Sequence, residues 1–168
     1  MKISLIDFIE GKDKKLEIKK NIANLSVDNI EFVEPTQISL QLFKVNDDLS
    51  GSLEVYFAYT EECSRCLKKY TNKINDKVEV FISSSEDELD NESIDFYNLL
   101  LTKGEINIED LIKEIFYINK PLKPLCSQNC KGLCPKCGAN LNEEDCDCEN
   151  KNIDPRLGKL QELLDKEV

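Results

Sequence analysis

The cysteines are the residues whose types and spacing indicate chemistry in this chain. Eight are present, and two pairs have the C-x-x-C form: Cys63 with Cys66, and Cys134 with Cys137. Two residues between cysteines let one tight turn supply two thiolates to a tetrahedral zinc ion, which binds four such ligands. Eight cysteines make two sets of four, so we predict one or two structural zinc ions. The other four predicted ligands are Cys126, Cys130, Cys146 and Cys148.

The pairing of the cysteines follows from their proximity along the chain. Cys134, Cys137, Cys146 and Cys148 are expected to form one ribbon-like site, which leaves Cys126 and Cys130 to join Cys63 and Cys66. Only one residue separates Cys146 from Cys148, which is tight for two ligands of one metal, so another partition stays open. A catalytic zinc is not expected, because the chain has no histidine. A redox role for Cys63 and Cys66 and an iron–sulfur cluster remain alternatives.

Composition restricts the class of protein. The 168 residues include 33 acidic and 22 basic side chains, a net charge of −11, and 40% are hydrophobic. This is too apolar for a disordered tail, and no apolar run approaches the roughly 18 residues that a membrane span needs. The first residues reach Asp7 before any apolar stretch that resembles a secretory signal. We therefore expect a cytoplasmic protein whose thiols stay reduced.

Alternating apolar residues predict the elements that must position the cysteines. Residues 38–42 and 53–59 read as an antiparallel hairpin with a turn at 46–52, and residues 78–82 read as a third strand. Weaker strands are predicted at residues 3–9, 16–19 and 95–107, and a helix that covers the sheet at residues 108–116. The predicted fold class is α+β, with an antiparallel, barrel-like sheet, a covering helix, a cysteine-rich zinc-ribbon-like segment and a C-terminal helix.

The predicted organisation has three parts. Residues 1–120 form an α+β core domain, residues 121–150 a cysteine-rich zinc-binding segment packed on the core, and residues 151–168 an amphipathic helix. Asp154 and Pro155 mark the start of that helix, because they fit its cap and its first position.

Several motifs together resemble one protein family. They are Cys63-Ser-Arg-Cys66-Leu67, the run at residues 124–142 (PLCSQNCKGLCPKCGANLN), the CDC at 146–148 and Asp154-Pro155-Arg156. From about Thr60 to its end the chain resembles the YceD family, described as large ribosomal RNA subunit accumulation proteins. The resemblance implies a non-enzymatic factor that supports the synthesis, processing or stability of large-subunit rRNA. It implies as partners this rRNA or the pre-ribosomal particle, and neither a membrane nor a small-molecule substrate is expected.

The charge of the chain does not decide between RNA and a protein as its partner. A net charge of −11 repels a polyanion, yet basic residues lie within and after the first cysteine pair. The residues predicted to contact RNA or a partner are Arg65, Lys68, Lys69, Lys73 and Arg156, with Tyr59 and Tyr70 available to stack on bases. Acidic runs at residues 86–92 and 143–147 favour the alternative of a zinc-dependent chaperone for a basic ribosomal protein. An rRNA-processing enzyme, the other alternative, would need clustered carboxylates for magnesium.

Overall fold

The computed structural model describes residues 1–23, 25–28, 30–46, 48–85 and 96–148. The chain divides into two compact units. The core unit comprises Met1–Ser64 and Lys68–Cys126, and the cysteine-rich unit comprises Arg65–Leu67 with the chain from Ser127 onward. The C-terminal helix predicted at residues 151–168 lies outside the described residues, and the boundary predicted after residue 120 stays a prediction.

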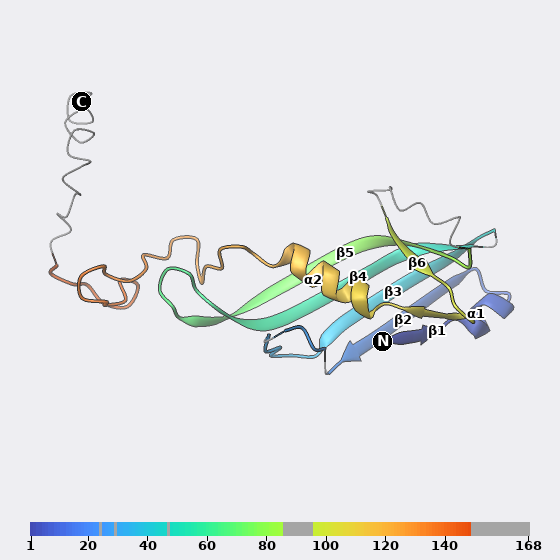
Figure 1. Cartoon of the computed structure of the whole chain (residues 1–168), viewed down its shortest axis with the longest axis horizontal. Helices are drawn as coiled ribbons and strands as arrows, with labels where there is room; N and C mark the ends of the chain where they lie inside the picture. The colour runs from blue at the N-terminus through green and yellow to red at the C-terminus, as the bar shows by residue number, and fades with distance from the viewer. Residues whose placement is uncertain (24, 29, 47, 86–95, 149–168) are drawn as a thin grey trace, which may run out of the picture. The chain divides into compact units, whose positions relative to one another are not determined.

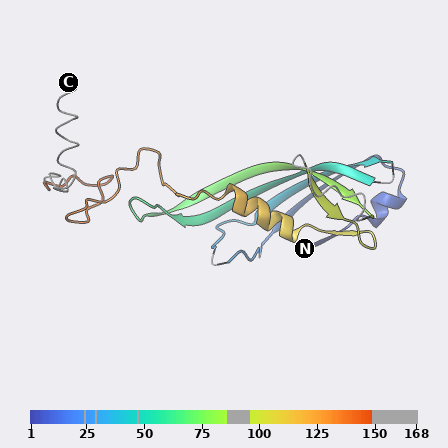
Figure 2. The same cartoon turned by 45° about the horizontal axis from the view of Figure 1, so that its top comes forward.

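The core unit contains an open five-stranded sheet in the order β2-β3-β4-β5-β6. Its strands are β2 (Lys15–Ile22), β3 (Thr36–Val45), β4 (Asp48–Glu62), β5 (Lys69–Ser83) and β6 (Tyr97–Leu100). A separate two-stranded sheet pairs β1 (Lys2–Ser4) with β7 (Glu105–Asn107). The helices are α1 (Ile6–Glu10) and α2 (Glu109–Asn119), and α2 crosses one face of β4 and β5 (Figures 1 and 2).

The structure differs from three predictions about the sheet and its strands. The α+β class is confirmed, but a barrel-like sheet is not, because β2 and β6 remain separate edges. The sheet is also not wholly antiparallel, because β6 pairs with β5 in parallel after the connection at residues 84–96, which is long enough for a return crossover. The strand expected at residues 3–9 ends at Ser4 and gives way to α1.

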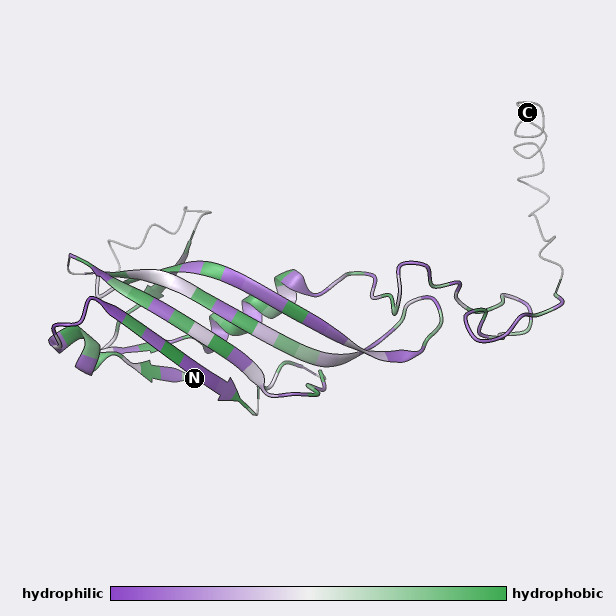
Figure 3. Ribbon diagram, turned by 180° about the vertical axis from the view of Figure 1, so that it is seen from behind, coloured by the Kyte–Doolittle hydropathy of each residue, from purple (hydrophilic) through white to green (hydrophobic). Residues whose placement is uncertain are grey.

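Alternation along the strands separates a buried face from an outer face. Leu40, Leu53 and Val55 are fully or almost fully buried on the side that α2 covers. Figure 3 views the opposite side of the sheet, where polar residues alternate with apolar ones along each strand. Such alternation is typical of an antiparallel sheet with one packed and one solvated face.

Aromatic rings fill the space beneath α2. The ring of Phe116 lies 5.3 Å from that of Phe57 and 4.9 Å from that of Tyr59, both in edge-on geometry. Burial of these side chains anchors the helix to β4, because aromatic residues contribute the largest apolar areas of a core. The amphipathic pattern therefore predicted both the helix and its buried face correctly.

Gly51 marks the closest approach of β4 to β3. A Cβ atom at this position would lie only 1.8 Å from the carbonyl oxygen of Gln41. No side chain fits there, so glycine is required for the two strands to pair in this register.

Candidate metal sites

The first cysteine turn connects β4 to β5. Cys63 follows the last residue of β4, and its amide donates to the carbonyl of Lys68 at 3.0 Å, just before β5 begins. Cys63 and Cys66 are buried, with 0% and 5% of their surface exposed. Leu67 adopts a left-handed conformation, with φ of 58°. A long regular hairpin thus holds both cysteines of this pair in one tight turn.

The segment after α2 returns to the same end of the core unit. The amide of Ser64 donates to the carbonyl of Pro124 at 2.8 Å, two residues before Cys126. The pKa of Tyr70 is raised, first by burial and then by the negative charges of Glu61, Cys63 and Cys126. The Tyr70 hydroxyl therefore lies among three acidic groups, two of them thiols.

Tyr59, Glu61 and Asn72 form a partly buried polar cluster where the C-terminal end of β4 pairs with β5. The sequence analysis did not predict this cluster. The amide of Asn72 donates to the Tyr59 hydroxyl at 3.0 Å and to Glu61 Oε2 at 3.1 Å. Glu61, whose side chain is 8% exposed, also lies 3.8 Å from Lys120. Tyr59 is 0% exposed, so the expectation that it stacks on bases is wrong. Its pKa is raised, chiefly by burial and then by Glu61.

The second cysteine turn, in the cysteine-rich unit, is a small hairpin. The amide of Gly138 donates to the carbonyl of Cys134 at 2.9 Å, and the amide of Cys134 to the carbonyl of Ala139 at 2.8 Å. Gly138 has a φ of 78°, which glycine adopts without the steric cost that other residues incur. Leu67 has the same place and the same left-handed conformation after the first pair, an equivalence that the letters of the two motifs do not reveal.

Two polar side chains fix the backbone around Cys130. The guanidinium of Arg65 donates to the carbonyl of Cys130 at 2.9 Å. The amide of Asn142 donates to the sulfur of Cys130 at 3.4 Å, and Asn142 Oδ1 accepts from the amide of Lys131 at 2.8 Å. Groups that hydrogen-bond to a ligand orient it for the metal. No local pattern in the sequence points to Asn142 in this role, and the contact of Arg65 with RNA stays a prediction.

The structure places the eight cysteines in two groups of four. The first contains Cys63, Cys66, Cys126 and Cys130; the second contains Cys134, Cys137, Cys146 and Cys148. Within each group all sulfur atoms lie within 4.8 Å of one another. Zinc at about 2.3 Å from each of four tetrahedral thiolates would place the sulfur atoms about 3.8 Å apart. Both groups therefore fit a metal ion such as zinc, in the partition that sequence proximity favoured.

Within the second group the thiols differ in how readily they ionise, because neighbouring groups shift their pKa values in opposite directions. Backbone amides of Cys137 and Lys136 lower the pKa of Cys134 to about 6. The hydrogen bond with Cys137 and then burial raise the pKa of Cys148 to about 12. A divalent cation would remove this difference, because a coordinating thiol is deprotonated outright.

The residues predicted to contact RNA or a partner come from different segments of the chain, and their role in such a contact stays a prediction. Lys69 and Lys73 face the same side of β5, because alternate residues of a strand share a face, and Lys73 lies opposite Ala58 of β4. Lys68 lies in the first cysteine turn, where Arg65 binds the carbonyl of Cys130. Arg156 lies outside the described residues. The part of the chain that the structure describes contains no helix long and apolar enough to cross a membrane.

Comparison with known proteins gives one family. The family described as large ribosomal RNA subunit accumulation protein YceD matches residues 51–164, more than half of the chain. The matched range includes all eight cysteines and extends from β4 through α2.

Individual relatives are similar over shorter stretches or at lower identity. A chloroplastic protein of Arabidopsis thaliana, named large ribosomal RNA subunit accumulation protein YCED homolog 1, is 37% identical over 37% of this chain and 19% of its own length. The maize (Zea mays) protein of the same name is 42% identical over 29% of this chain and 17% of its own length. An uncharacterised Mycobacterium leprae protein is 26% identical over 83% of this chain and 64% of its own length. This chain thus spans less than two thirds of each relative, and no solved structure matches it.

Proposed function

This chain belongs to the YceD family of large ribosomal RNA subunit accumulation proteins, and we propose that it supports the accumulation of large-subunit rRNA as a zinc-stabilised binding factor, without catalysis. The family match across residues 51–164 is the observation that carries the proposal. The family's name supports the proposed role in large-subunit rRNA accumulation. The binding mechanism, the zinc ions, the absence of catalysis and a cytoplasmic location are our proposals.

The geometry of the cysteines supports a structural role for the metal. In each group four sulfur atoms lie close enough to complete the shell of one zinc ion. Catalytic zinc sites instead keep one position open for water or substrate. We propose that the two ions hold together the loops that carry the cysteines, and that other surfaces bind the partner.

Metal content tests the zinc proposal directly. Protein purified under reducing conditions should contain two zinc ions per chain by atomic emission. Replacing Cys134 and Cys137 by serine should reduce this to one ion, because the first group stays complete. The matched control is Ser64→Ala, which changes the first cysteine turn without removing a thiol and should keep both ions. Iron in place of zinc, or no metal at all, would contradict the proposal.

The cellular role is tested by complementation. Cells that lack the gene should contain less large-subunit rRNA relative to small-subunit rRNA, and a tagged copy should restore the ratio. At moderate salt the tagged protein should sediment with large-subunit precursors. An unchanged rRNA ratio in the deletion strain would refute the proposed function. Accumulation of uncut precursor, together with cleavage of that precursor by the purified protein, would favour an rRNA-processing enzyme instead.

The net charge favours a chaperone for a basic ribosomal protein as the second candidate function. At −11 the chain attracts cationic proteins and repels free RNA. The two candidates differ in where the protein sediments. A chaperone of a free ribosomal protein would stay in the light fractions, and it would bind its partner without RNA.

A further inference from the structure

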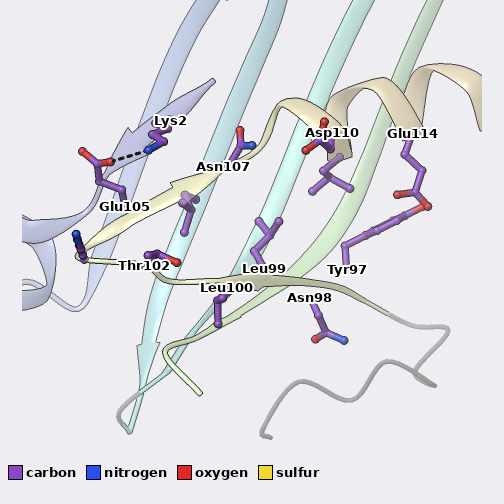
Figure 4. A pocket seen from close by; sticks show the side chains of 13 residues that line it. Lys2, Tyr97, Asn98, Leu99, Leu100, Thr102, Glu105, Asn107, Asp110 and Glu114 are labelled. Carbon is purple, nitrogen blue, oxygen red and sulfur yellow. Dashed lines mark ion pairs between the residues drawn. The ribbon is translucent and has the colours of Figure 1, made fainter. Parts of the chain in front are cut away.

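The core unit has a cavity of about 610 Å³ on the side of the sheet where β6 forms the edge. Its walls come from β6, from β7 with the preceding turn, and from the first two turns of α2 (Figure 4). This volume is in the range of sites that enclose small ligands or several side chains of a partner. All of its lining residues lie within the core unit.

Strand edges border the cavity on two sides. Among the described residues, β6 is the last strand of the five-stranded sheet and pairs with β5, while β7 pairs with β1 and, through Glu105, bridges to Thr102. An edge strand presents backbone donors and acceptors that an added strand can use. Addition of an extended peptide to such an edge is a common mode of recognition, in which pockets beside the edge accept alternate side chains.

The cavity combines an apolar floor with acidic groups. Leu111 is buried, and Leu99 is partly buried against the core. Asp110 and Glu114 lie one turn apart on α2 and are exposed, and Figure 4 shows Tyr97 and Glu114 pointing toward each other. The pKa of Tyr97 is raised by burial and then by the charges of Glu114 and Asp76, which places both carboxylates near its hydroxyl.

Basic residues at the cavity only partly offset these acids. Lys2 lies 3.9 Å from Glu105, so the pair is close to neutral. With Lys103 the lining carries two basic and three acidic side chains, a sum of −1. The two carboxylates on α2 have no cation within ion-pair distance among the described residues. The site therefore favours a cationic occupant, as does the chain's net charge of −11.

We propose that this cavity binds an extended, basic segment of a protein partner, which adds as a strand to the outer edge of β6. Apolar side chains of the segment pack on Leu99 and Leu111, and its lysine or arginine side chains reach Asp110 and Glu114. The inference that the occupant is extended and basic rests on the residues that line the cavity. The occupant's identity as a component of the assembling large subunit rests on the proposed function.

Purified full-length protein and synthetic peptides test this proposal. The probe is a fluorescein-labelled nine-residue peptide of alternating lysine and valine, with binding followed by fluorescence anisotropy. A second peptide has the same sequence with every backbone amide nitrogen methylated, so that it keeps the charge and the side chains but cannot donate the backbone hydrogen bonds of a strand. The first peptide should bind with an affinity that decreases with salt, and the methylated peptide should not bind measurably. Equal binding of the two would refute strand addition.

A pair of matched variants tests the position of the site. Asp110→Asn with Glu114→Gln removes two negative charges at the cavity and should weaken peptide binding about two- to thirtyfold, the range expected for two partly exposed ion pairs. Glu31→Gln with Glu34→Gln makes the same change in net charge on exposed residues outside the cavity lining. This control should bind as the wild type does. Equal weakening by both double variants would show that only net charge matters.

Hydrogen exchange identifies the edge that is used. Bound peptide should slow amide exchange in the proteolytic fragment that contains β6, Tyr97–Leu100, and not in the one that contains β2, Lys15–Ile22. Protection only outside β6 would refute the site, and binding of a single-stranded RNA without binding of the peptide would refute the partner class. If the peptide fails to bind while gene deletion still lowers the rRNA ratio, the cavity proposal fails and the proposed function stands. If the peptide binds at β6 while gene deletion leaves the rRNA ratio unchanged, the proposed function fails and the docking site stands.

Discussion

If the two cysteine groups hold zinc as proposed, the left-handed residue that follows each C-x-x-C pair should make zinc affinity sensitive to a single methyl group. At Gly138 an added Cβ would meet no atom within 4 Å, so Gly138→Ala creates no clash. Its cost is backbone strain at a φ of 78°, roughly 1–2 kcal/mol for an L-residue. Because a site of this kind folds as it binds its metal, this cost should appear in metal affinity. We expect zinc at the second group to be bound about five- to thirtyfold more weakly.

The reciprocal change at the first cysteine pair should act in the opposite direction. Leu67 has a φ of 58° and is 58% exposed, so Leu67→Gly relieves strain and removes little packing. The relief is partly offset by the conformational freedom of glycine in the unfolded chain, and we expect zinc retention to improve by up to about tenfold.

Competition with a chromophoric chelator under reducing conditions measures both effects. Lys136→Ala is the matched control, because Lys136 lies between Cys134 and Cys137 and is not among the residues of positive φ. Its zinc should be released as in the wild type. Unchanged zinc release in both Gly138→Ala and Leu67→Gly would refute the reasoning, because the strain would then not contribute to metal binding.

Three further predictions concern the core unit. Gly51→Ala should prevent folding or lower the thermal midpoint strongly in circular dichroism, because the added Cβ would overlap the backbone of β3. Phe116→Ala should lower the free energy of unfolding in urea by about 3–5 kcal/mol, because a fully buried aromatic ring leaves a cavity. The hydrogen bond from Lys113 is the largest of several contacts that together lower the pKa of Glu109 from 4.5 to about 2, so the stability that they contribute is present above pH 4.5 and is lost as pH falls through 2. Glu109→Gln should therefore make the urea midpoint fall less between pH 5 and pH 2, and an unchanged profile would exclude that contribution.

Local patterns in the sequence were sufficient to predict the central part of the fold. Alternation identified β3 and β4, and the helical stripe at Leu111, Ile112 and Phe116 identified α2 with its buried face. The predicted turn at residues 46–52 was too long, because the strands extend to Val45 and Asp48. Alternation marks which side chains are buried, and it does not mark where backbone pairing ends.

Features set by distant parts of the chain were not predictable in the same way. No local pattern shows that β6 lies parallel to β5, or that Lys2–Ser4 pairs with Glu105–Asn107 instead of continuing as a strand. The cysteine spacing indicated four-thiol sites, but the support that Asn142 gives to Cys130 depends on a bend that brings them together. Leu67 was missed because the sequence marks a left-handed position clearly only where glycine occupies it.

The pairing of β1 with β7 has a consequence for synthesis on the ribosome. Ile3 pairs with Ile106, so these two partners are separated by about 100 residues of chain that must be made in between. At roughly 5–20 residues per second, the first strand waits about 5–20 seconds for its partner after it is synthesised. During that interval Ile3 and Leu5, which are 1% exposed in the folded protein, have no β7 to pack beside. The N-terminal strand is therefore a part of the core unit that waits long for its partner, and we expect it to be accessible to chaperones and proteases during that interval.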